Sequence, residues 1–544
     1  MPTPQTDMDR VMMFQSAPLA YFNRETNLHH AVPLQDYDYE RHAMFKALES
    51  AEKVGATIDL EVEPGHIERL RTYFDQGTSR VLHLSCYGHP DQLAFENDSG
   101  YLETMSSDEL RNLIKAQNAG PCPLKLVVVN SFHSGRIGKA FVDAGVPHVV
   151  CCHHTEIFRD KAAAGFVKNL YRGLAQNKSL KQAFYTAQEA VRVEEISKHV
   201  DRYVLLPQKT EDDDYHDVPI FYTGKVPAVG MSDEEDRERP NILPTLPKHF
   251  MGREVDIYEV LEALKVDDVV RIGGPKGSGK ASLAAATCRY VDQRRKMFGY
   301  DEVFWLPAAQ GVIPDEDTLF ADLCELVNRM MKGGDMFEDE ETMEISDRIQ
   351  IELEATRALI AIDSRKFNTD VAAENLELFL GELFNKEEVN VKVIVVAAAH
   401  EEVEGDEVEE DTIKLKSIDF KSTALLFGEV SRFITANGCP AAQSPDEFAA
   451  LMVPPSVAKI QDQAKFSSSR RTHLMEAMGL GNPLDVIKAG KTMPASSFIK
   501  LIGMANTPEV QVDSYRSLEA AINRWSEQRD LAVKAKNYLR ATDL

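Results

Sequence analysis

Apolar runs alternate with amphipathic segments over the first 230 residues. The runs at 124–129 and 146–152 are mostly apolar, as expected of buried strands, whereas 37–54 and 179–193 repeat apolar residues at helical spacing. Such strand–helix units predict a doubly wound parallel sheet, with functional side chains at the carboxyl ends of its strands. We expect strands at 11–15, 56–62, 81–85, 124–129 and 146–152, a hairpin at 92–101, and helices at 37–54, 66–73, 106–116, 138–144, 157–175 and 179–193.

A second pattern, of strand, glycine-rich turn and helix, lies near the middle of the chain. The apolar run 269–272 leads into glycines and Lys280, and the spacing from Gly274 to Lys280 fits a phosphate-binding loop. Backbone N–H groups, the helix N-terminus and the lysine ammonium favour an anion there. The hydroxyl that normally ligates Mg²⁺ is replaced by Ala281, and Ser282 is turned about a hundred degrees further round the helix. The loop therefore predicts phosphate binding with weak metal chemistry.

Composition narrows the class of protein. Acidic residues outnumber basic ones by 87 to 61, which gives a net charge of −26 and argues against nucleic acid or an anionic membrane as a partner. No apolar run approaches the roughly 18 residues of a membrane span, and the first ten residues lack a secretory pattern. The seven cysteines, an odd number, suit a reducing compartment. We expect a cytoplasmic protein of three or four domains at about 150 residues each.

Several ordered blocks of the first half resemble the CHAT domain, a family of caspase-like cysteine peptidases. The resemblance covers residues 8–225 and implies a caspase-like parallel-sheet fold. The blocks are Ala17–Leu19, Val81–His89, Leu126–Gly135, Phe141–Val150 and Phe166–Ala187.

The resemblance also implies a catalytic histidine and cysteine, and both positions have changed. Tyr87 stands at the histidine position and Phe132 at the cysteine position. A phenol is a poor base near neutral pH and phenylalanine has no nucleophile, so we expect no catalytic residues and no peptidase activity. A shifted register would offer His89 as the base and Cys152 as a relocated thiol.

The ends of three predicted strands bring cysteines and histidines to one rim of the sheet. Besides Tyr87, His89 and Phe132, these are Cys86, His133 and the run Cys151–His154. They admit a displaced Cys–His pair or a metal site. The simpler interpretation, which we favour, is buried cysteines that pack as small apolar residues and histidines on polar loops.

A charged, proline-containing linker spans 231–249, and the residues after it resemble the STAND class of NTPases, which includes NB-ARC modules. Phe250–Glu254 matches the start of that module, and Asp363 ends a strand like the Walker B strand. Where the class has a second acid and a sensor arginine, this chain has Ser364 and Ala397–His400. The resemblance implies ATP or ADP as ligand, with Mg²⁺ held weakly at Asp363. The expected nucleotide-binding residues are Gly252, Arg253, Gly274, Gly277, Ser278, Gly279, Lys280, Ala281, Ser282, Asp363 and Pro483.

The predicted fold is therefore α/β throughout, with a helical C-terminus. Residues 1–230 form a caspase-like domain, 250–427 a three-layer P-loop NTPase core, and 428–544 a helical lid and tail. Within these, 335–344 and 401–411 are expected as acidic loops, and 511–537 as a helix.

The expected function is nucleotide-binding regulation of signalling, with a degenerate peptidase domain as an interaction module for other proteins. The alternatives are a nucleotide-gated endopeptidase with a relocated thiol and a slow ATPase. The sequence leaves open the partner proteins, oligomerisation, the pathway, any cleavage preference and whether nucleotide is hydrolysed.

Overall fold

The structure is a computed structural model, and its elements divide into two units that are described separately. Unit 1 comprises residues 1–241 and 293–299, and unit 2 comprises 242–292 and 300–544. The described residues are 9–32, 37–49, 58–76, 79–89, 91–117, 124–152, 160–194, 203–208, 214–221, 243–306, 356–364, 370–384, 390–397, 412–431, 433–434, 444–452 and 468–505.

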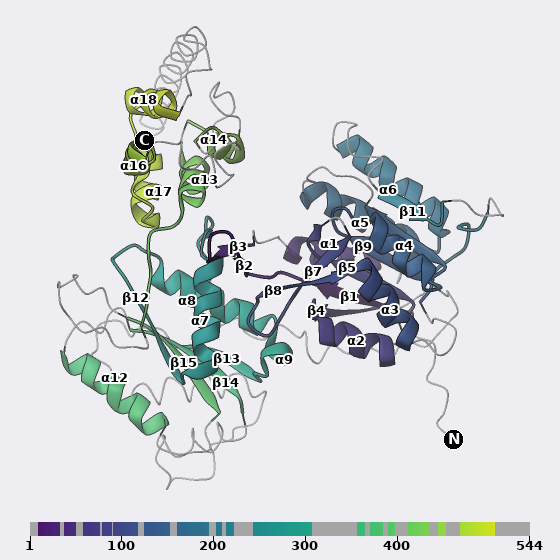
Figure 1. Cartoon of the computed structure of the whole chain (residues 1–544), viewed down its shortest axis with the longest axis horizontal. Helices are drawn as coiled ribbons and strands as arrows, with labels where there is room; N and C mark the ends of the chain where they lie inside the picture. The colour runs from purple at the N-terminus through teal and green to yellow at the C-terminus, as the bar shows by residue number, and fades with distance from the viewer. Residues whose placement is uncertain are drawn as a thin grey trace, which may run out of the picture. The chain divides into compact units, whose positions relative to one another are not determined.

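Unit 1 is built on a six-stranded sheet with the order β11-β10-β9-β5-β1-β4 (Figure 1). Its strands are parallel except for β11, which pairs antiparallel with β10 at one edge. A smaller antiparallel sheet, β6-β7-β8, carries the predicted hairpin, and β2 pairs with β3. The strands are β1 (Arg10–Gln15), β2 (Ala20–Asn23), β3 (Leu28–Ala31), β4 (Asp59–Pro64), β5 (Val81–Ser85), β6 (Gly88–His89), β7 (Gln92–Glu96), β8 (Leu102–Ser106), β9 (Leu126–Asn130), β10 (His148–Cys152) and β11 (Tyr203–Leu206).

Helices cover both faces of this sheet because alternate strand residues point to opposite sides. On one face Val11, Val128 and Val150 pack against α1, α5 and α6, and on the other Leu82, Val127 and Val149 pack against α2, α3 and α4. The helices are α1 (Tyr37–Leu48), α2 (Ile67–Gln76), α3 (Ser107–Gln117), α4 (Gly135–Asp143), α5 (Asp160–Ala175), α6 (Leu180–Glu194) and α9 (Arg295–Phe298).

Several details of unit 1 differ from the sequence-based elements: β11 was not predicted, β8 carries the expected hairpin on to Ser106, and β4 ends at Pro64. The helix expected at 138–144 begins at Gly135. The hydroxyl of the preceding Ser134 donates a hydrogen bond to the carbonyl oxygen of Ser131. The hairpin formed by β2 and β3 was not predicted, because Leu28-His29-His30-Ala31 lacks the alternation of a half-buried strand.

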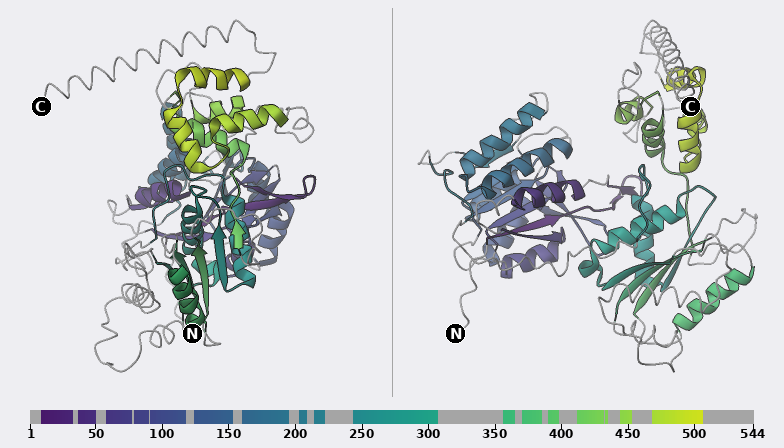
Figure 2. Two further views of the ribbon diagram at one scale, coloured as in Figure 1. Left: turned by 90° about the vertical axis from the view of Figure 1, so that its left-hand side faces the viewer. Right: turned by 180° about the vertical axis from the view of Figure 1, so that it is seen from behind.

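Unit 2 contains a five-stranded parallel sheet of order β13-β14-β15-β12-β16. Helix α12 packs on one face, where Phe379 meets Ile360 and Val393, and α8 contacts the strands from the other face (Figure 2). This is the expected three-layer arrangement. The elements are α7 (Glu254–Val266), β12 (Val269–Gly273), α8 (Lys280–Asp292), β13 (Glu302–Leu306), β14 (Ala358–Asp363), α12 (Asp370–Leu383), β15 (Val391–Val396) and β16 (Thr412–Lys414).

The remaining described part of unit 2 is helical and has its own core around Phe427, Phe448 and Phe498. Asp419 caps α13 by accepting hydrogen bonds from the N–H groups of Lys421 and Ser422, so this helix begins at Phe420 and ends at Val430. No helix in the described ranges is long and apolar enough to cross a membrane. The acidic loops and the helix expected at 511–537 lie outside the described residues. The helices are α13 (Phe420–Val430), α14 (Pro445–Met452), α16 (Ser468–Met478), α17 (Pro483–Thr492) and α18 (Ala495–Ala505).

Candidate functional site

The loops after the neighbouring strands β5 and β9 carry Tyr87 and Phe132, the two predicted dyad positions, at one rim of the sheet in unit 1. Gly88, next to Tyr87, packs so closely on the loop after β9 that a Cβ there would lie 1.7 Å from the carbonyl oxygen of Phe132. The Tyr87 and Phe132 side chains are half-buried, and His89 is exposed. The rim expected from the sequence is therefore present in the structure, and no thiol or imidazole stands at those two positions.

The cysteines near this rim are buried. Cys86 is 3% exposed, and burial raises the pKa of its thiol to about 12. Burial likewise raises the pKa of Cys151, which is fully buried. Cys152 is 5% exposed and belongs to an apolar core cluster, and its N–H donates to Ser134 Oγ at 2.8 Å. These surroundings are those of packed residues rather than reactive thiolates.

The metal alternative finds no support within the described part of the chain. No group of three or more His, Cys, Asp or Glu side chains there could hold a metal ion. His153 and His154, which the sequence placed on the same rim, lie outside the described residues.

A buried carboxylate, not predicted from the sequence, lies beneath the rim. Glu40 of α1 accepts hydrogen bonds from His83 Nε2 at 3.0 Å, Ser85 Oγ at 2.6 Å and Asn130 Nδ2 at 2.6 Å. Burial by itself raises the pKa of Glu40, but these bonds and the charge of His83 outweigh it and the net pKa is lowered. The ionised carboxylate thus ties α1 to the ends of β5 and β9.

The glycine-rich loop of unit 2 has the backbone of a phosphate cradle. Gly274, Gly277 and Gly279 have φ values of 138°, 84° and 95°, which favour glycine because it lacks a Cβ. Lys280 begins α8, and its Nζ donates to the carbonyl oxygen of Gly274 at 2.5 Å. The ammonium is therefore held over the loop that it is expected to serve.

Arg253 supports the loop from beneath. It is 4% exposed, and one guanidinium nitrogen donates to the carbonyl oxygen of Ser278 at 2.8 Å while another pairs with Asp256 at 2.9 Å. Ser278 Oγ and Arg253 Nε are buried and have no hydrogen-bond partner among the described residues. Such orphaned donors are costly unless a ligand satisfies them.

The C-terminal helices close over the same loop. Asn482 caps α17 by accepting from the N–H of Leu484 at 3.1 Å, and its Nδ2 donates to the carbonyl oxygen of Lys276 at 3.1 Å. The Leu484 N–H also approaches the carbonyl oxygen of Gly277 at 3.4 Å. The sequence identified Pro483 but missed Asn482, because this contact joins positions 206 residues apart.

These elements enclose a cavity of about 460 Å³ in unit 2. Of the expected residues, Arg253, the stretch 277–282 and Pro483 line it, whereas Gly252, Gly274 and Asp363 do not. Gly252 has a packing role, because a Cβ there would meet Ser422 Cβ at 2.5 Å. Apolar residues that the sequence did not identify complete the wall: Phe250, Met251, Leu426, Leu484 and Ile487.

The sequence associates Ala281, Asp363 and Ser364 with metal and water chemistry. Ala281 lines the cavity without a hydroxyl, and Asp363 is 7% exposed at the end of β14. Ser364 Oγ donates to the carbonyl oxygen of Val396 at 2.8 Å, so its hydroxyl is engaged in holding β15.

Comparisons with solved structures give weak global likenesses. The Arg-specific cysteine proteinase gingipain R is 10% identical over 37% of this chain and 46% of its own, with a TM-score of 0.27. A STAND protein with a tetratricopeptide repeat sensor from Pyrococcus horikoshii is 17% identical over 49% of this chain and 34% of its own, with a TM-score of 0.26. The ADP form of the Aeropyrum pernix ORC2 protein is 14% identical over 52% and 72%, with a TM-score of 0.27. No function is inferred from scores this low.

Sequence comparisons identify the first domain. A curated Roc-COR-CHAT protease from an unknown prokaryotic organism is 28% identical over 116 residues, which is 21% of this chain and only 11% of that relative. The family model of the CHAT domain matches residues 11–234. Residues 11–234 of this chain are therefore a CHAT domain.

Proposed function

We propose that this chain is a nucleotide-binding regulatory protein that uses its CHAT domain as an interaction module for other proteins. The observation that carries the proposal is the phosphate loop. Lys280 and the orphaned Ser278 Oγ adjoin one cavity of about 460 Å³ in unit 2. This arrangement fits ADP or ATP, because backbone N–H donors, a lysine ammonium and a serine hydroxyl can all bind a polyphosphate.

The apolar part of the same cavity suits the base. Phe250, Met251 and Ile487 offer an apolar and aromatic wall beside the loop, and ligand sites commonly combine such walls with a few polar groups. Pro483 and Leu484 of α17 close the cavity on the side of the phosphate loop. Bound nucleotide would therefore contact both the loop and the lid helix.

Hydrolysis is proposed to be slow or absent. Phosphoryl transfer depends on metal, positioned water and charge stabilisation of the terminal phosphate. In this chain Ala281 lacks the metal hydroxyl, and the Ser364 hydroxyl is committed to the Val396 carbonyl. Binding itself needs only the cradle and Lys280, so Mg²⁺ at Asp363 adds little affinity.

The CHAT domain is proposed to act without cleaving peptides. Phe132 and Tyr87 replace the nucleophile and the base, and Cys86 and Cys152 are buried among apolar neighbours. The close fit of Gly88 on the Phe132 carbonyl supports an intact backbone frame around these positions. We assign residues 1–230 to this module, 231–249 to a linker, 250–427 to the NTPase core and 428–544 to the lid and tail.

Calorimetric titration and thermal unfolding of the full chain with ADP test the proposal. Binding should raise the unfolding free energy of unit 2 by about 2.7 kcal/mol at a hundredfold excess over Kd. Lys280→Ala should abolish the shift. Lys265→Ala is the control, because it removes an exposed lysine of α7 that does not line the cavity and should keep the shift. A wild type that millimolar ADP neither binds nor stabilises would refute the proposal.

A further inference from the structure

A short basic segment after the phosphate-loop helix belongs to unit 1. Helix α8 ends at Asp292, and the next residues, Gln293-Arg-Arg-Lys-Met-Phe-Gly299, make their contacts within unit 1 although the chain on either side belongs to unit 2. We call residues 293–299 the basic segment. Helix α8 begins with Lys280, so the phosphate loop and the basic segment are joined by a single helix of 13 residues.

Arg294 anchors the basic segment through a buried ion pair. Its Nε lies 3.0 and 3.1 Å from the two carboxylate oxygens of Glu96. The Arg294 side chain is 8% exposed and the Glu96 side chain is fully buried. Two such charges are stable in the interior only while they are paired, and removal of one partner is strongly destabilising. The contact therefore fixes the basic segment to one point of unit 1.

That point is on the hairpin formed by β6 and β7, which begins directly after Tyr87. Glu96 is the last residue of β7, and β7 pairs antiparallel with β6, where Gly88 lies opposite Leu93. Gly88 in turn packs on the carbonyl oxygen of Phe132. One strand thus contacts Arg294 at one end and the rim of the CHAT domain at the other.

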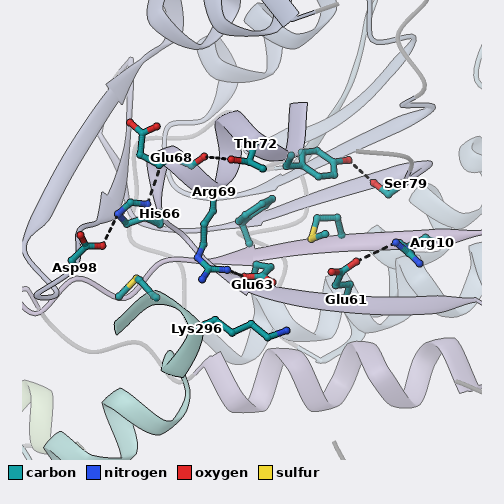
Figure 3. A pocket seen from close by; sticks show the side chains of 14 residues that line it. Arg10, Glu61, Glu63, His66, Glu68, Arg69, Thr72, Ser79, Asp98 and Lys296 are labelled. Atoms are coloured by element: carbon teal, nitrogen blue, oxygen red, sulfur yellow. Dashed lines mark hydrogen bonds and ion pairs between the residues drawn. The ribbon is translucent and has the colours of Figure 1, made fainter. Parts of the chain in front are cut away.

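A second contact region of the basic segment is a cavity of about 550 Å³ in unit 1 (Figure 3). Glu61 and Glu63 of the edge strand β4 face into it, and Lys296 and Met297 complete its wall. Burial raises the pKa of Glu61, and the charges of Arg10 and Lys296 oppose that rise. Glu61 and Glu63 are paired with Arg10 and Arg69 of the same wall, and Lys296 of the basic segment adds a further cation beside them.

We propose that the basic segment couples nucleotide binding to the CHAT rim. Phosphate bound at the N-terminus of α8 restrains that helix, and its covalent continuation at Arg294 restrains Glu96, β7 and Gly88. The inference rests on the proposed nucleotide binding and adds to it the regulated surface, which is the hairpin 88–96. Coupling between two sites is reciprocal. A partner that binds the rim therefore changes the ADP affinity by the same factor by which ADP changes the affinity for that partner.

Hydrogen exchange of the full chain, measured by mass spectrometry with and without ADP, tests the coupling. In the wild type, ADP should slow exchange in peptides covering residues 86–97. Arg294→Ala and Glu96→Gln should remove that response while calorimetry still detects ADP binding. Arg294→Lys keeps the charge and should keep part of the response. Arg295→Ala, on the same short helix, is the control and should respond like the wild type.

The outcomes separate the coupling from the nucleotide proposal. The coupling is overturned if bound ADP slows exchange in residues 86–97 equally in wild type and Arg294→Ala. It is also overturned if bound ADP leaves the exchange of these residues unchanged in the wild type. No ADP binding by calorimetry refutes the proposed function and removes the input to the coupling. The contact of the basic segment with the hairpin can then be tested without nucleotide. Amides of residues 86–97 should exchange at least about tenfold faster in Arg294→Ala than in Arg295→Ala. Equal exchange rates in the two variants would refute the contact.

Discussion

Gly88 packs directly on the carbonyl group of Phe132. A Cβ at Gly88 would lie 1.7 Å from the Phe132 oxygen and 2.4 Å from Ser131 Oγ, which no side chain tolerates. The two loops at the ends of β5 and β9 are therefore fitted backbone to backbone, at Phe132 and beside Tyr87, where the sequence predicts that a catalytic cysteine and histidine are replaced.

The first prediction follows from that contact. Gly88→Ala should destabilise unit 1 by at least about 2 kcal/mol, because the new methyl group meets a backbone carbonyl that cannot rotate away. Thermal unfolding followed by circular dichroism measures the loss. Gly381→Ala on α12, where a Cβ meets nothing within 4 Å, should instead leave unit 2 equally stable or stabilise it slightly. Equal stability of Gly88→Ala and wild type would contradict the close contact.

The second prediction concerns the missing dyad. The double variant Tyr87→His, Phe132→Cys should gain one thiol that reacts with iodoacetamide, because an imidazole beside a half-buried cysteine lowers the thiol pKa. Labelling followed by peptide mapping measures it. Phe132→Cys alone is the control and should react more slowly. A folded double variant whose new thiol is no more reactive than in the single variant would show that the rim does not juxtapose the two side chains.

The parallel sheet of unit 1 could be predicted because its buried strands are continuous apolar runs in the sequence. Leu126–Asn130 is buried at four of its five positions, and its apolar run is visible without any partner. The hairpin turn at Asn97–Gly100 was likewise predicted, because glycine and asparagine mark such turns. In both cases the signal is local.

The polar interior could not be predicted in the same way. Glu40 lies in an otherwise amphipathic helix, and its partners His83 and Asn130 are 43 and 90 positions away. Arg294 pairs with Glu96, which is 198 positions away in the sequence. An acidic or basic residue in a helix is usually solvated, so only the tertiary fold reveals that these charges are buried. The candidate phosphate loop was visible in sequence, while its lid contact at Asn482 was not.

The third prediction is a pH dependence that originates at Glu40. Because its pKa is lowered on folding, this carboxylate stabilises unit 1 above its ordinary pKa of 4.5, and that stabilisation is lost as the pH falls through the lower, folded value. Glu40→Gln should lower the unfolding free energy by about 3 kcal/mol at pH 7. The substitution removes the negative charge and replaces one carboxylate oxygen by an NH2 group, which cannot accept a hydrogen bond from His83, Ser85 or Asn130. It should also flatten the decline in acid. Urea unfolding between pH 7 and pH 3 measures both effects.

The exposed Glu68→Gln of α2 is the control for Glu40. It should match the wild type at neutral pH and keep the decline in acid. A Glu40→Gln variant as stable as the control at pH 7 would contradict an ionised, hydrogen-bonded carboxylate in the interior.

The fourth prediction separates the two bonds of Asn482. Asn482→Asp keeps the acceptor that caps α17 but loses the donor to the Lys276 carbonyl, whereas Asn482→Ala loses both. Both variants should therefore release ADP faster than wild type, and only the alanine variant should also lose about 1 kcal/mol of lid stability. Stopped-flow release of a fluorescent ADP analogue and thermal unfolding measure the two effects. Release rates unchanged in both variants would show that the lid does not hold the nucleotide.

The last prediction restores the metal hydroxyl. In wild type, Mg²⁺ should change ADP affinity by less than about twofold, because Ala281 offers no ligand beside the phosphates. Ala281→Ser should make affinity depend on Mg²⁺ by about tenfold, the effect expected when one supporting group of a metal site is gained. Ser282→Ala is the control and should leave the metal dependence as in wild type. Calorimetry with Mg²⁺ or with EDTA measures the ADP affinity of all three proteins.

ATP turnover should stay low even in Ala281→Ser. Position 364 carries a serine in place of the second acid that would polarise water, and its hydroxyl donates to the carbonyl oxygen of Val396. A wild type that already needs Mg²⁺ to bind ADP would contradict this assignment and place a metal ligand elsewhere in the site.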